Sequence, residues 1–291
     1  MIYIGRQLFC VIALLAFLSA CSSLPKRINY ADSIANNANM QKQEIDTGSF
    51  LLTTYYKISD RQAPVSIYIE GDGFAWASSS RLSQNPTPKD AFTLQLAAED
   101  SVRNIVYIAR PCQYTDLAKD KICAPKYWSQ SRFAEIVVDS VNKAISHYSA
   151  QFNNPKINLI GYSGGAAIAA LIAARRNDIT SLRTVAGNLD HVAVNKYHHV
   201  DNLDDSLNAI DVAAKLASLP QYHFAGTLDE IIPESVITAF AKKSEQGGAC
   251  VKVSSINGAT HYSGWKENWR ELLSQPVICE SVLNKNINNK G

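Results

Sequence analysis

Short apolar segments alternate with amphipathic or alanine-rich segments along most of this chain. The apolar segments are rich in valine, isoleucine, tyrosine and leucine, a composition that favours strands buried in a sheet. We expect such strands at residues 50–58, 65–70, 104–109, 156–160, 182–186, 221–224 and 250–256.

Helical periodicity marks the segments between the expected strands. Apolar residues recur at helical spacing over residues 131–148, and residues 164–175 are apolar on nearly all sides, which predicts a buried helix. We also expect helices, the first capped by Asp90, at residues 90–98, 211–219, 233–243 and 265–273. This alternation predicts an α/β fold with a mostly parallel central sheet and helices on both faces, and ligands bind such sheets at the carboxyl ends of the strands.

The N-terminus has the layout of a secretory signal. Arg6 precedes an apolar run over residues 8–18, which is shorter than the roughly 20 apolar residues that a transmembrane helix needs. The sequence Leu-Ser-Ala-Cys, which ends at Cys21, follows directly and resembles the bacterial lipobox. That resemblance implies cleavage before Cys21 and lipid on its thiol, and Ser22 in the next position implies the outer membrane. An uncleaved N-terminal anchor helix is the alternative.

Composition and charge narrow the classes of partner. The chain is 46% hydrophobic and 19% charged, which are ordinary values for a globular protein. Its formal net charge is +2, and removal of the signal with its one charged residue, Arg6, lowers it to +1. Neither value suggests nucleic acid or an acidic polymer as a partner. Residues 22–43 are polar and rich in asparagine, and we expect a tether with a short helix near residues 31–40.

The chain has six cysteines, of which Cys10 lies in the signal and Cys21 is the lipidation site. An even number remains, which indicates disulfides in an exported protein. These cysteines are Cys112, Cys123, Cys250 and Cys279. Three pairings are open, and we favour Cys112–Cys123 and Cys250–Cys279 because the members of each pair are local in sequence. A metal site is the alternative, which the lack of CxxC or histidine-rich spacing disfavours.

The strongest chemical signal is the motif Gly161-Tyr162-Ser163-Gly164-Gly165. An apolar strand leads directly into it and an alanine-rich helix leads out, which is the strand–turn–helix context of a nucleophile elbow. Side chains at Gly161 and Gly165 would crowd the neighbouring strand and helix, and the helix N-terminus behind Ser163 favours developing negative charge. A glycine-rich turn with a passive serine is the alternative.

With this motif in this context, the chain resembles the α/β-hydrolases from about residue 50 to residue 283. In that superfamily the acid and then the histidine follow the serine along the chain. Residues 226–233 resemble the superfamily's acid loop, which implies that Asp229, rather than its neighbour Glu230, orients the histidine. His261 follows the last expected strand and precedes the last expected helix, where the histidine of the superfamily lies.

The same resemblance implies an oxyanion hole made of two backbone N–H groups. One belongs to Gly164, the residue after the nucleophile. The other belongs to Asp72, by a match to the loop after the corresponding strand, in which Glu70 replaces the usual histidine. A tight turn without contact to substrate is the alternative.

Three further segments, residues 68–73, 109–114 and 186–190, are similar to markers of a group of bacterial lipoprotein hydrolases of undefined substrate. The resemblances together divide the chain into three parts. They are a signal peptide at residues 1–20, a lipidated N-terminus with a polar tether at residues 21–43, and an α/β-hydrolase domain at residues 44–291.

The implied function is that of a serine hydrolase, held by lipid in the bacterial cell envelope, that acts on a small-molecule or lipid ester. No cofactor or metal is expected. Phe74, Trp76 and the 112–123 loop are expected at the rim of the pocket, with residues 188–207 as a short lid. A non-catalytic lipid-anchored binding protein with the same fold and a serine peptidase are the two alternatives, and the oligomeric state stays open.

Overall fold

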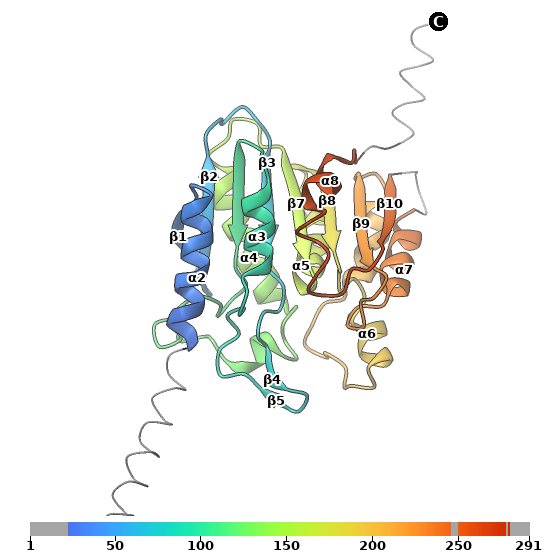
Figure 1. The fold of residues 1–291 in the computed structure, drawn as a ribbon, viewed down its shortest axis with the longest axis horizontal. Coiled ribbons are helices and arrows are strands. Elements are labelled where there is room, and N and C mark those ends of the chain that lie inside the picture. The colour runs from blue at the N-terminus through green and yellow to red at the C-terminus, as the bar shows by residue number, and fades with distance from the viewer. Residues whose placement is uncertain (1–22, 246–249, 278, 280–291) are drawn as a thin grey trace, which may run out of the picture.

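The computed structural model describes residues 23–245, 250–277 and 279. Its main feature is an eight-stranded sheet in the order β1-β2-β6-β3-β7-β8-β9-β10. The strands of this sheet are β1 (Gln41–Asp46), β2 (Leu51–Ile58), β3 (Val65–Ile69), β6 (Asn104–Ile108), β7 (Ile157–Tyr162), β8 (Ile179–Val185), β9 (Gln221–Gly226) and β10 (Val251–Ile256). A separate hairpin of β4 (Trp76–Ser78) and β5 (Arg81–Leu82) lies beyond its lower edge in Figure 1.

Most of the sheet is parallel. Strands β6, β3, β7, β8, β9 and β10 pair in parallel, whereas β2 is antiparallel to both of its neighbours, β1 and β6. The seven strands predicted from the sequence are all present, with some ends shifted by a few residues. The prediction of a mostly parallel central sheet is confirmed, and the carboxyl ends of its parallel strands meet at one edge.

Helices cover both faces of the sheet, as predicted. They are α2 (Ser23–Asn37), α3 (Phe92–Glu99), α4 (Glu135–Ser149), α5 (Gly164–Ala173), α6 (His191–Tyr197), α7 (Glu234–Ser244) and α8 (Trp269–Ser274), with 3₁₀-helices η1 (Pro125–Trp128) and η2 (Ala209–Leu216). In Figure 1, α2, α3 and α8 lie over the near face, and they share one hydrophobic core with it. Helices α4, α5 and α7 contribute to the core on the opposite face. Among the described residues, no helix combines the length and hydropathy needed to cross a membrane.

Alternation along the central strands supplies both cores. On β3, Ile67 and Ile69 pack toward α4 and α5, whereas Tyr68 packs on the other face with Trp269 of α8 at a ring-centroid distance of 6.2 Å. Helix α5 lies behind β7 with all of its residues buried, which confirms the prediction of a buried alanine-rich helix. Its small side chains let α5 approach the sheet closely.

Residues 23–43 are not the predicted tether, since they belong to the folded domain. Ala31 and Ala35 of α2 are buried, and β1 continues the sheet by pairing with β2. Asp32 Oδ1 accepts hydrogen bonds from the Tyr55 hydroxyl at 2.6 Å and from Lys42 Nζ at 3.0 Å. The asparagine-rich composition concealed these elements because α2 buries only a narrow alanine stripe and β1 is an edge strand with mostly exposed side chains.

Several helix boundaries also differ from the predicted ones. Asp90 does not cap α3, because Ala91 occupies the N-cap position at φ 48° without a side-chain cap. The helix expected at residues 211–219 is the 3₁₀-helix η2 at Ala209–Leu216. Helix α8 begins at Trp269 rather than at residue 265, because the fully buried Trp265 belongs to the preceding loop, where its Nε1–H donates to the Thr260 carbonyl at 2.8 Å.

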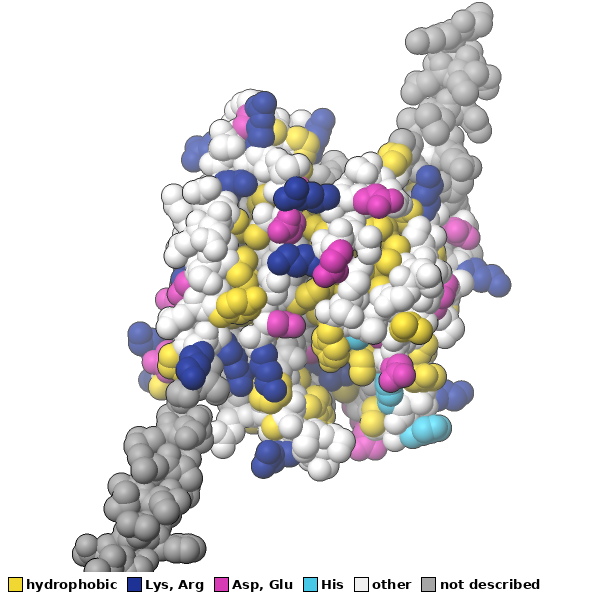
Figure 2. Space-filling model, in the orientation of Figure 1, with side chains coloured by type: hydrophobic (Ala, Val, Ile, Leu, Met, Phe, Trp, Pro, Cys, Tyr) yellow, Lys and Arg dark blue, Asp and Glu magenta, His cyan; other side chains and the backbone are white. Residues whose placement is uncertain are grey.

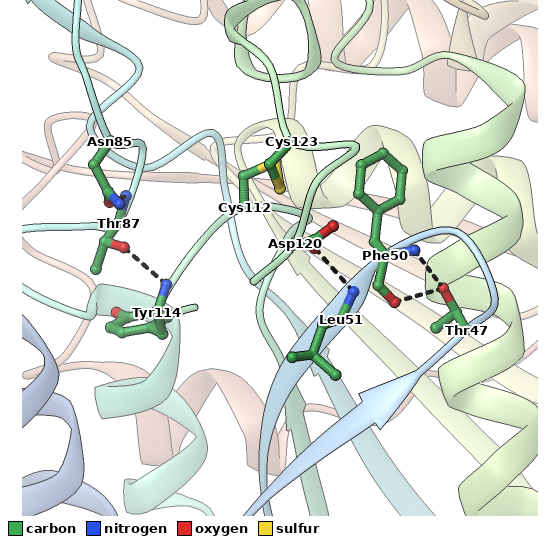
Figure 3. Close-up of a disulfide and its surroundings, with 9 residues drawn as sticks. All are labelled: Thr47, Phe50, Leu51, Asn85, Thr87, Cys112, Tyr114, Asp120 and Cys123. Carbon is green, nitrogen blue, oxygen red and sulfur yellow. Dashed lines mark hydrogen bonds between the residues drawn. A yellow bond between two sulfur atoms is a disulfide. The ribbon is translucent and has the colours of Figure 1, made fainter. Parts of the chain in front are cut away.

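Two disulfides join the pairs that the sequence favoured, Cys112–Cys123 with a Cα–Cα distance of 5.6 Å and Cys250–Cys279 with one of 4.0 Å. Figure 3 shows how the 112–123 loop is tied to its surroundings. Asp120 Oδ2 accepts from the Leu51 N–H at 2.9 Å, and the Tyr114 N–H donates to Thr87 Oγ1 at 2.7 Å. The first disulfide therefore fixes a loop that follows β6 at the carboxyl edge of the sheet.

We expect the two disulfides to differ in their contribution to stability. The sequence separation is 29 for Cys250–Cys279 and 11 for Cys112–Cys123. Loop-closure entropy then predicts that Cys250→Ser lowers the free energy of unfolding by about 1 kcal/mol more than Cys112→Ser does. Cys112→Ser should instead change KM, because its loop follows β6 at the carboxyl edge of the sheet, where the sequence places the pocket. Thermal unfolding of both variants and of the double variants Cys112→Ser/Cys123→Ser and Cys250→Ser/Cys279→Ser tests this, and the reverse order of stability would contradict it.

Candidate active site

Ser163 occupies a strained turn between β7 and α5. Its backbone lies at φ 52° and ψ −120°, a region that non-glycine residues rarely adopt. The turn is held by three backbone hydrogen bonds: the Ser163 N–H donates to the Val185 carbonyl at 3.0 Å, and the Ser163 carbonyl accepts from Ala166 at 3.1 Å and from Asn188 at 3.0 Å. The backbone therefore places the Ser163 side chain at the carboxyl end of a central strand.

The glycines of the motif have a steric role. A Cβ on Gly161 would lie 2.5 Å from the Ala166 Cα, and a Cβ on Gly165 would lie 2.2 Å from the Ile69 carbonyl oxygen. Both distances are shorter than real Cβ contacts, and the obstructing atoms belong to backbone that cannot move aside cheaply. The close packing of α5 against β3 and β7 thus explains why these positions are glycine.

The structure brings together the three residues that the resemblance named. His261 Nε2 lies 3.0 Å from Ser163 Oγ, and His261 Nδ1 lies 2.9 Å from Asp229 Oδ2. The Asp229 side chain is fully buried and the His261 side chain is 5% exposed. Water is therefore largely excluded from a continuous hydrogen-bonded chain that runs from carboxylate to imidazole to hydroxyl.

Separate contacts orient the acid and the histidine. Asp229 Oδ1 accepts from the backbone N–H groups of Ile231 at 2.9 Å and Ile232 at 2.8 Å, which leaves Oδ2 for the imidazole. The Tyr162 hydroxyl donates to the His261 carbonyl at 2.9 Å, and the Tyr162 ring lies 5.3 Å from the imidazole centroid. In this arrangement His261 can accept the hydroxyl proton of Ser163 while Asp229 stabilises the resulting cation. Glu230, the sequence rival of Asp229, is exposed.

The two N–H groups expected to form an oxyanion hole lie on adjacent segments. Gly164 opens α5, so its N–H has no acceptor within the helix, and the Asp72 N–H has no acceptor among the described residues. A Cβ on Gly164 would lie 2.1 Å from Asp72 Oδ1, so the two residues are in contact. Both N–H groups are thus available for a ligand at this place.

The predicted lipidation residue, Cys21, lies outside the described residues.

Solved structures with this architecture occur at low sequence identity. Est1E from Butyrivibrio proteoclasticus superposes with a TM-score of 0.54 at 16% identity, over 80% of this chain and 97% of that one. An esterase from Pyrococcus furiosus superposes with a TM-score of 0.54 at 10% identity, over 81% of this chain and 91% of that one. The chain has the α/β-hydrolase fold.

Part of a larger protein matches this α/β-hydrolase fold as well. The acylaminoacyl peptidase from Pyrococcus horikoshii superposes with a TM-score of 0.58 at 12% identity, and the match covers 80% of this chain but 40% of the peptidase. No family model matches this chain, nor does any of the curated proteins compared with it. The predicted fold is confirmed, and the grouping with lipoprotein hydrolases remains a prediction.

Two arginines that were given no role from the sequence lie beside the candidate site. Arg110 Nη1 lies 3.3 Å from Asp72 Oδ1, and Arg132 Nε lies 3.4 Å from Asp72 Oδ2. The Asp72 carboxylate touches Gly164, where its charge would repel an oxyanion, and the guanidinium groups offset that charge. Arg110 lies two residues after the end of β6, at the carboxyl edge of the sheet. A charged residue in that position is the signal by which the sequence could have indicated it.

Glu70 supports the Asp72 loop from inside the protein. It is 1% exposed, and its carboxylate accepts hydrogen bonds from the Gly71 N–H at 2.9 Å, from the Tyr107 hydroxyl at 2.8 Å and from the Thr93 hydroxyl. Burial raises the pKa of Glu70 to about 7, because the charged form loses its hydration. As the pH falls, the Glu70 carboxylate therefore gains a proton near neutral pH, directly behind the loop that carries Asp72.

We expect this burial to appear as a pH-dependent stability. The pKa of Glu70 is raised from 4.5 to about 7 on folding, so its contribution is fully present below about pH 4.5 and is lost as the pH rises through about 7. The free energy of unfolding of the wild type, minus that of Glu70→Gln, should fall by about 3 kcal/mol over this interval. Denaturant unfolding from pH 4.5 to pH 8 measures the difference. Glu267→Gln, at an exposed position, is the control, and a Glu70→Gln difference that does not change with pH would contradict the expectation.

The expected rim residues take different positions. Trp76 is 46% exposed on the β4–β5 hairpin, whereas Phe74 is partly buried with Arg27 Cζ and Lys89 Nζ at 4.8 Å and 3.9 Å from its ring centroid. The segment expected as a short lid contains α6, whose N-terminus is capped by the Asp190 side chain. Among the described residues, no cluster of three or more histidine, cysteine, aspartate or glutamate side chains could hold a metal ion.

Proposed function

We propose that this protein is a serine hydrolase that cleaves an ester-type acyl substrate through an acyl-enzyme. The observation that carries the proposal is the chain of hydrogen bonds from Asp229 through His261 to Ser163, at 2.9 Å and 3.0 Å. Its location adds support, because Ser163 stands on a strained backbone turn at a helix N-terminus. A serine that served only the fold would need neither the imidazole nor the buried carboxylate behind it.

The proposed reaction has two acyl-transfer steps. Ser163 Oγ attacks the substrate carbonyl while His261 Nε2 takes the hydroxyl proton, and the tetrahedral oxyanion accepts hydrogen bonds from the N–H groups of Gly164 and Asp72. His261 then returns the proton to the departing alcohol, which leaves an ester on Ser163. In the second step His261 takes a proton from water, which attacks the acyl carbonyl of this ester. The bond to Ser163 Oγ then breaks, His261 returns the proton to Oγ, and the acid leaves. Asp229 holds the imidazole tautomer throughout.

Ester cleavage is favoured over peptide cleavage as the proposal. Est1E and the Pyrococcus furiosus esterase match this chain over nearly their full length. The acylaminoacyl peptidase matches it over only 40% of its own length. An alcohol is also a better leaving group than an amine, so an ester makes the smaller demand on the site.

Fluorophosphonate labelling followed by a substrate panel tests the proposal. The probe phosphonylates only an activated serine, and peptide mapping of the full-length protein should find the label on Ser163. A panel of 4-nitrophenyl esters and peptide 4-nitroanilides with matched acyl groups then separates esterase from peptidase. An unlabelled protein would favour the non-catalytic binding alternative, and cleavage of the anilides alone would favour the peptidase.

We also propose that lipid on Cys21 anchors the domain to the bacterial envelope, at the outer membrane. Helix α2 begins two residues after Cys21, and Arg27 Nη1 of this helix donates to the Thr87 carbonyl in the loop near the candidate site, at 3.0 Å. Several basic side chains gather near the start of the described chain in Figure 2. Arg27 of α2 and Lys89 both lie over the Phe74 ring, at 4.8 Å and 3.9 Å from its centroid. They favour contact with anionic lipid headgroups. The anchor would keep the site close to the membrane.

Replacement of the lipidation residue should release the protein from membranes. Cys21→Ser removes the thiol that would carry diacylglycerol, and a domain without acyl chains has little affinity for a bilayer. We expect most of the wild type in the membrane fraction and most of the variant in the soluble fraction. Metabolic labelling with palmitate should mark the wild type and leave Cys21→Ser unlabelled. Cys10→Ser is the matched control, and a Cys21→Ser variant that stays acylated would contradict the prediction.

A further inference from the structure

An open hollow adjoins the Asp72 side of the candidate site. Its volume is about 10 Å³, which is room for about one water molecule, and it opens to solvent. Tyr127 and Trp128 contribute apolar walls, and Asp72, Arg110 and Arg132 contribute charges. Because Asp72 also touches Gly164, the hollow lies next to the place proposed for the oxyanion. A substrate bound to Ser163 could therefore extend into it.

The charges in this hollow do not balance. Asp72 is the only ion-pair partner of either Arg110 or Arg132 among the described residues, which leaves two guanidinium groups for one carboxylate. Both guanidinium carbons lie over the same Phe133 ring, at 5.4 Å and 5.5 Å from its centroid. The Arg110 side chain is 4% exposed and that of Arg132 is 13% exposed. Water therefore reaches the excess positive charge poorly, and a second anion would stabilise it.

The two arginines differ in the donors that they keep free. Arg110 uses Nη1 on Asp72 and Nη2 on the Arg132 carbonyl, so its terminal groups are occupied. Arg132 contacts Asp72 only through Nε at 3.4 Å, and neither of its terminal nitrogens has a partner among the described residues. A guanidinium with both terminal nitrogens free presents the fork that matches a carboxylate.

A neighbouring histidine does not change the charge balance of the hollow. His191 stacks on Phe133 with a centroid distance of 5.9 Å, and neither of its ring nitrogens has a partner among the described residues. Burial, with a contribution from Arg132, lowers the pKa of His191, so the ring is neutral at pH 7. His191 can thus donate or accept a hydrogen bond without adding to the charge.

We propose that Arg132, held by Asp72 and backed by Arg110, binds a carboxylate carried by the ester substrate. This inference rests on the proposed ester hydrolysis and names its substrate class. A single excess charge in a small hollow suits a monoanionic carboxylate better than a doubly charged phosphate. The arginine pair would then have two roles, since it offsets Asp72 beside the oxyanion hole and fixes the acidic end of the substrate.

Matched charged and neutral esters test the subsite. On the acyl side, mono-4-nitrophenyl glutarate is compared with 4-nitrophenyl pentanoate, which has the same chain length. On the alcohol side, 4-acetoxybenzoate is compared with 4-acetoxybenzamide. We expect kcat/KM of the wild type to favour the charged member of one pair about 10- to 100-fold, mainly through KM, as for hydrogen bonds to a charged group. Arg132→Gln should abolish this preference, and kcat/KM of the charged ester should fall more than that of the neutral ester, because Arg110 still offsets the Asp72 charge beside the oxyanion.

Further variants separate a binding role from a structural one. Arg132→Lys keeps a charge without the fork and should retain part of the preference, and Lys143→Gln removes an exposed charge from α4 as the control. If Arg132→Gln lowers turnover of charged and neutral esters equally, Arg132 only positions Asp72 and the proposal is wrong. It is also wrong if the wild type cleaves esters with no preference in either pair.

A binding measurement keeps this inference distinct from the proposed reaction. Calorimetric titration of the Ser163→Ala protein with monomethyl glutarate should show binding that disappears in the Ser163→Ala/Arg132→Gln double variant. Unchanged circular dichroism spectra of both proteins establish that they are folded. If fluorophosphonate leaves Ser163 unlabelled but this titration succeeds, the hydrolase proposal fails and the carboxylate site stands. Absence of binding in the folded Ser163→Ala protein overturns the carboxylate site, whatever the label shows.

Discussion

Replacement of Ser163 by alanine is expected to lower kcat for an ester substrate by about 10⁵-fold, because the variant has no group that can form the acyl-enzyme. The fold should persist, since the turn is held by the backbone hydrogen bonds of Ser163, which alanine can also make. Fluorophosphonate labelling should vanish together with turnover. The measurement is single-substrate kinetics with a 4-nitrophenyl ester, with circular dichroism as the check on folding.

The control for Ser163→Ala is Ser79→Ala, which removes an exposed hydroxyl from the segment that joins β4 and β5. It should leave turnover unchanged. Residues of a triad act as one unit, so Ser163→Ala/His261→Ala should be about as inactive as Ser163→Ala alone. Turnover above a hundredth of the wild-type value in Ser163→Ala would move the nucleophile to another residue.

Asp229→Asn is the prediction with the second largest effect, a loss of about 10⁴-fold in kcat. The reason lies in the contacts of Asp229 Oδ1, which accepts from the N–H groups of Ile231 and Ile232. These donors hold the oxygen of asparagine in the same place, so the amide NH₂ must face His261 Nδ1. His261 Nδ1 must then accept a hydrogen bond from this NH₂ group, so the ring proton moves to Nε2. With Nε2 protonated, His261 can no longer take a proton from Ser163.

Glu230→Gln is the matched control for Asp229→Asn, because it neutralises the adjacent carboxylate, which is exposed. It should retain nearly full turnover. The same pair of variants also decides between the two acids that the sequence offered. A larger loss for Glu230→Gln than for Asp229→Asn would contradict the assignment drawn from the buried contact with His261.

Local sequence patterns predicted most of the sheet and the helices around Ser163. Strands such as β3 and β7 are buried on both faces, so they appear as continuous apolar runs, and α5 appears as a run of small apolar residues. Elements with little buried surface were missed, above all β1, where Ile45 is the buried residue of a polar edge strand. Periodicity detects an element through its buried face, so a narrow face leaves little signal.

The nucleophile motif, the acid loop and the histidine are each local signals that could be read along the chain, because steric and turn requirements act between near neighbours. The order of the strands and the contacts of Arg110 and Arg132 depend on segments far apart in sequence. Arg110 follows β6 and Arg132 precedes α4, yet both reach Asp72, which follows β3. Only the tertiary structure brings these charges to one hollow, because long side chains meet wherever packing places their backbones. The sequence therefore determined the chemistry proposed for Ser163, and the packing of β3, β6 and α4 decided which charge stands beside it.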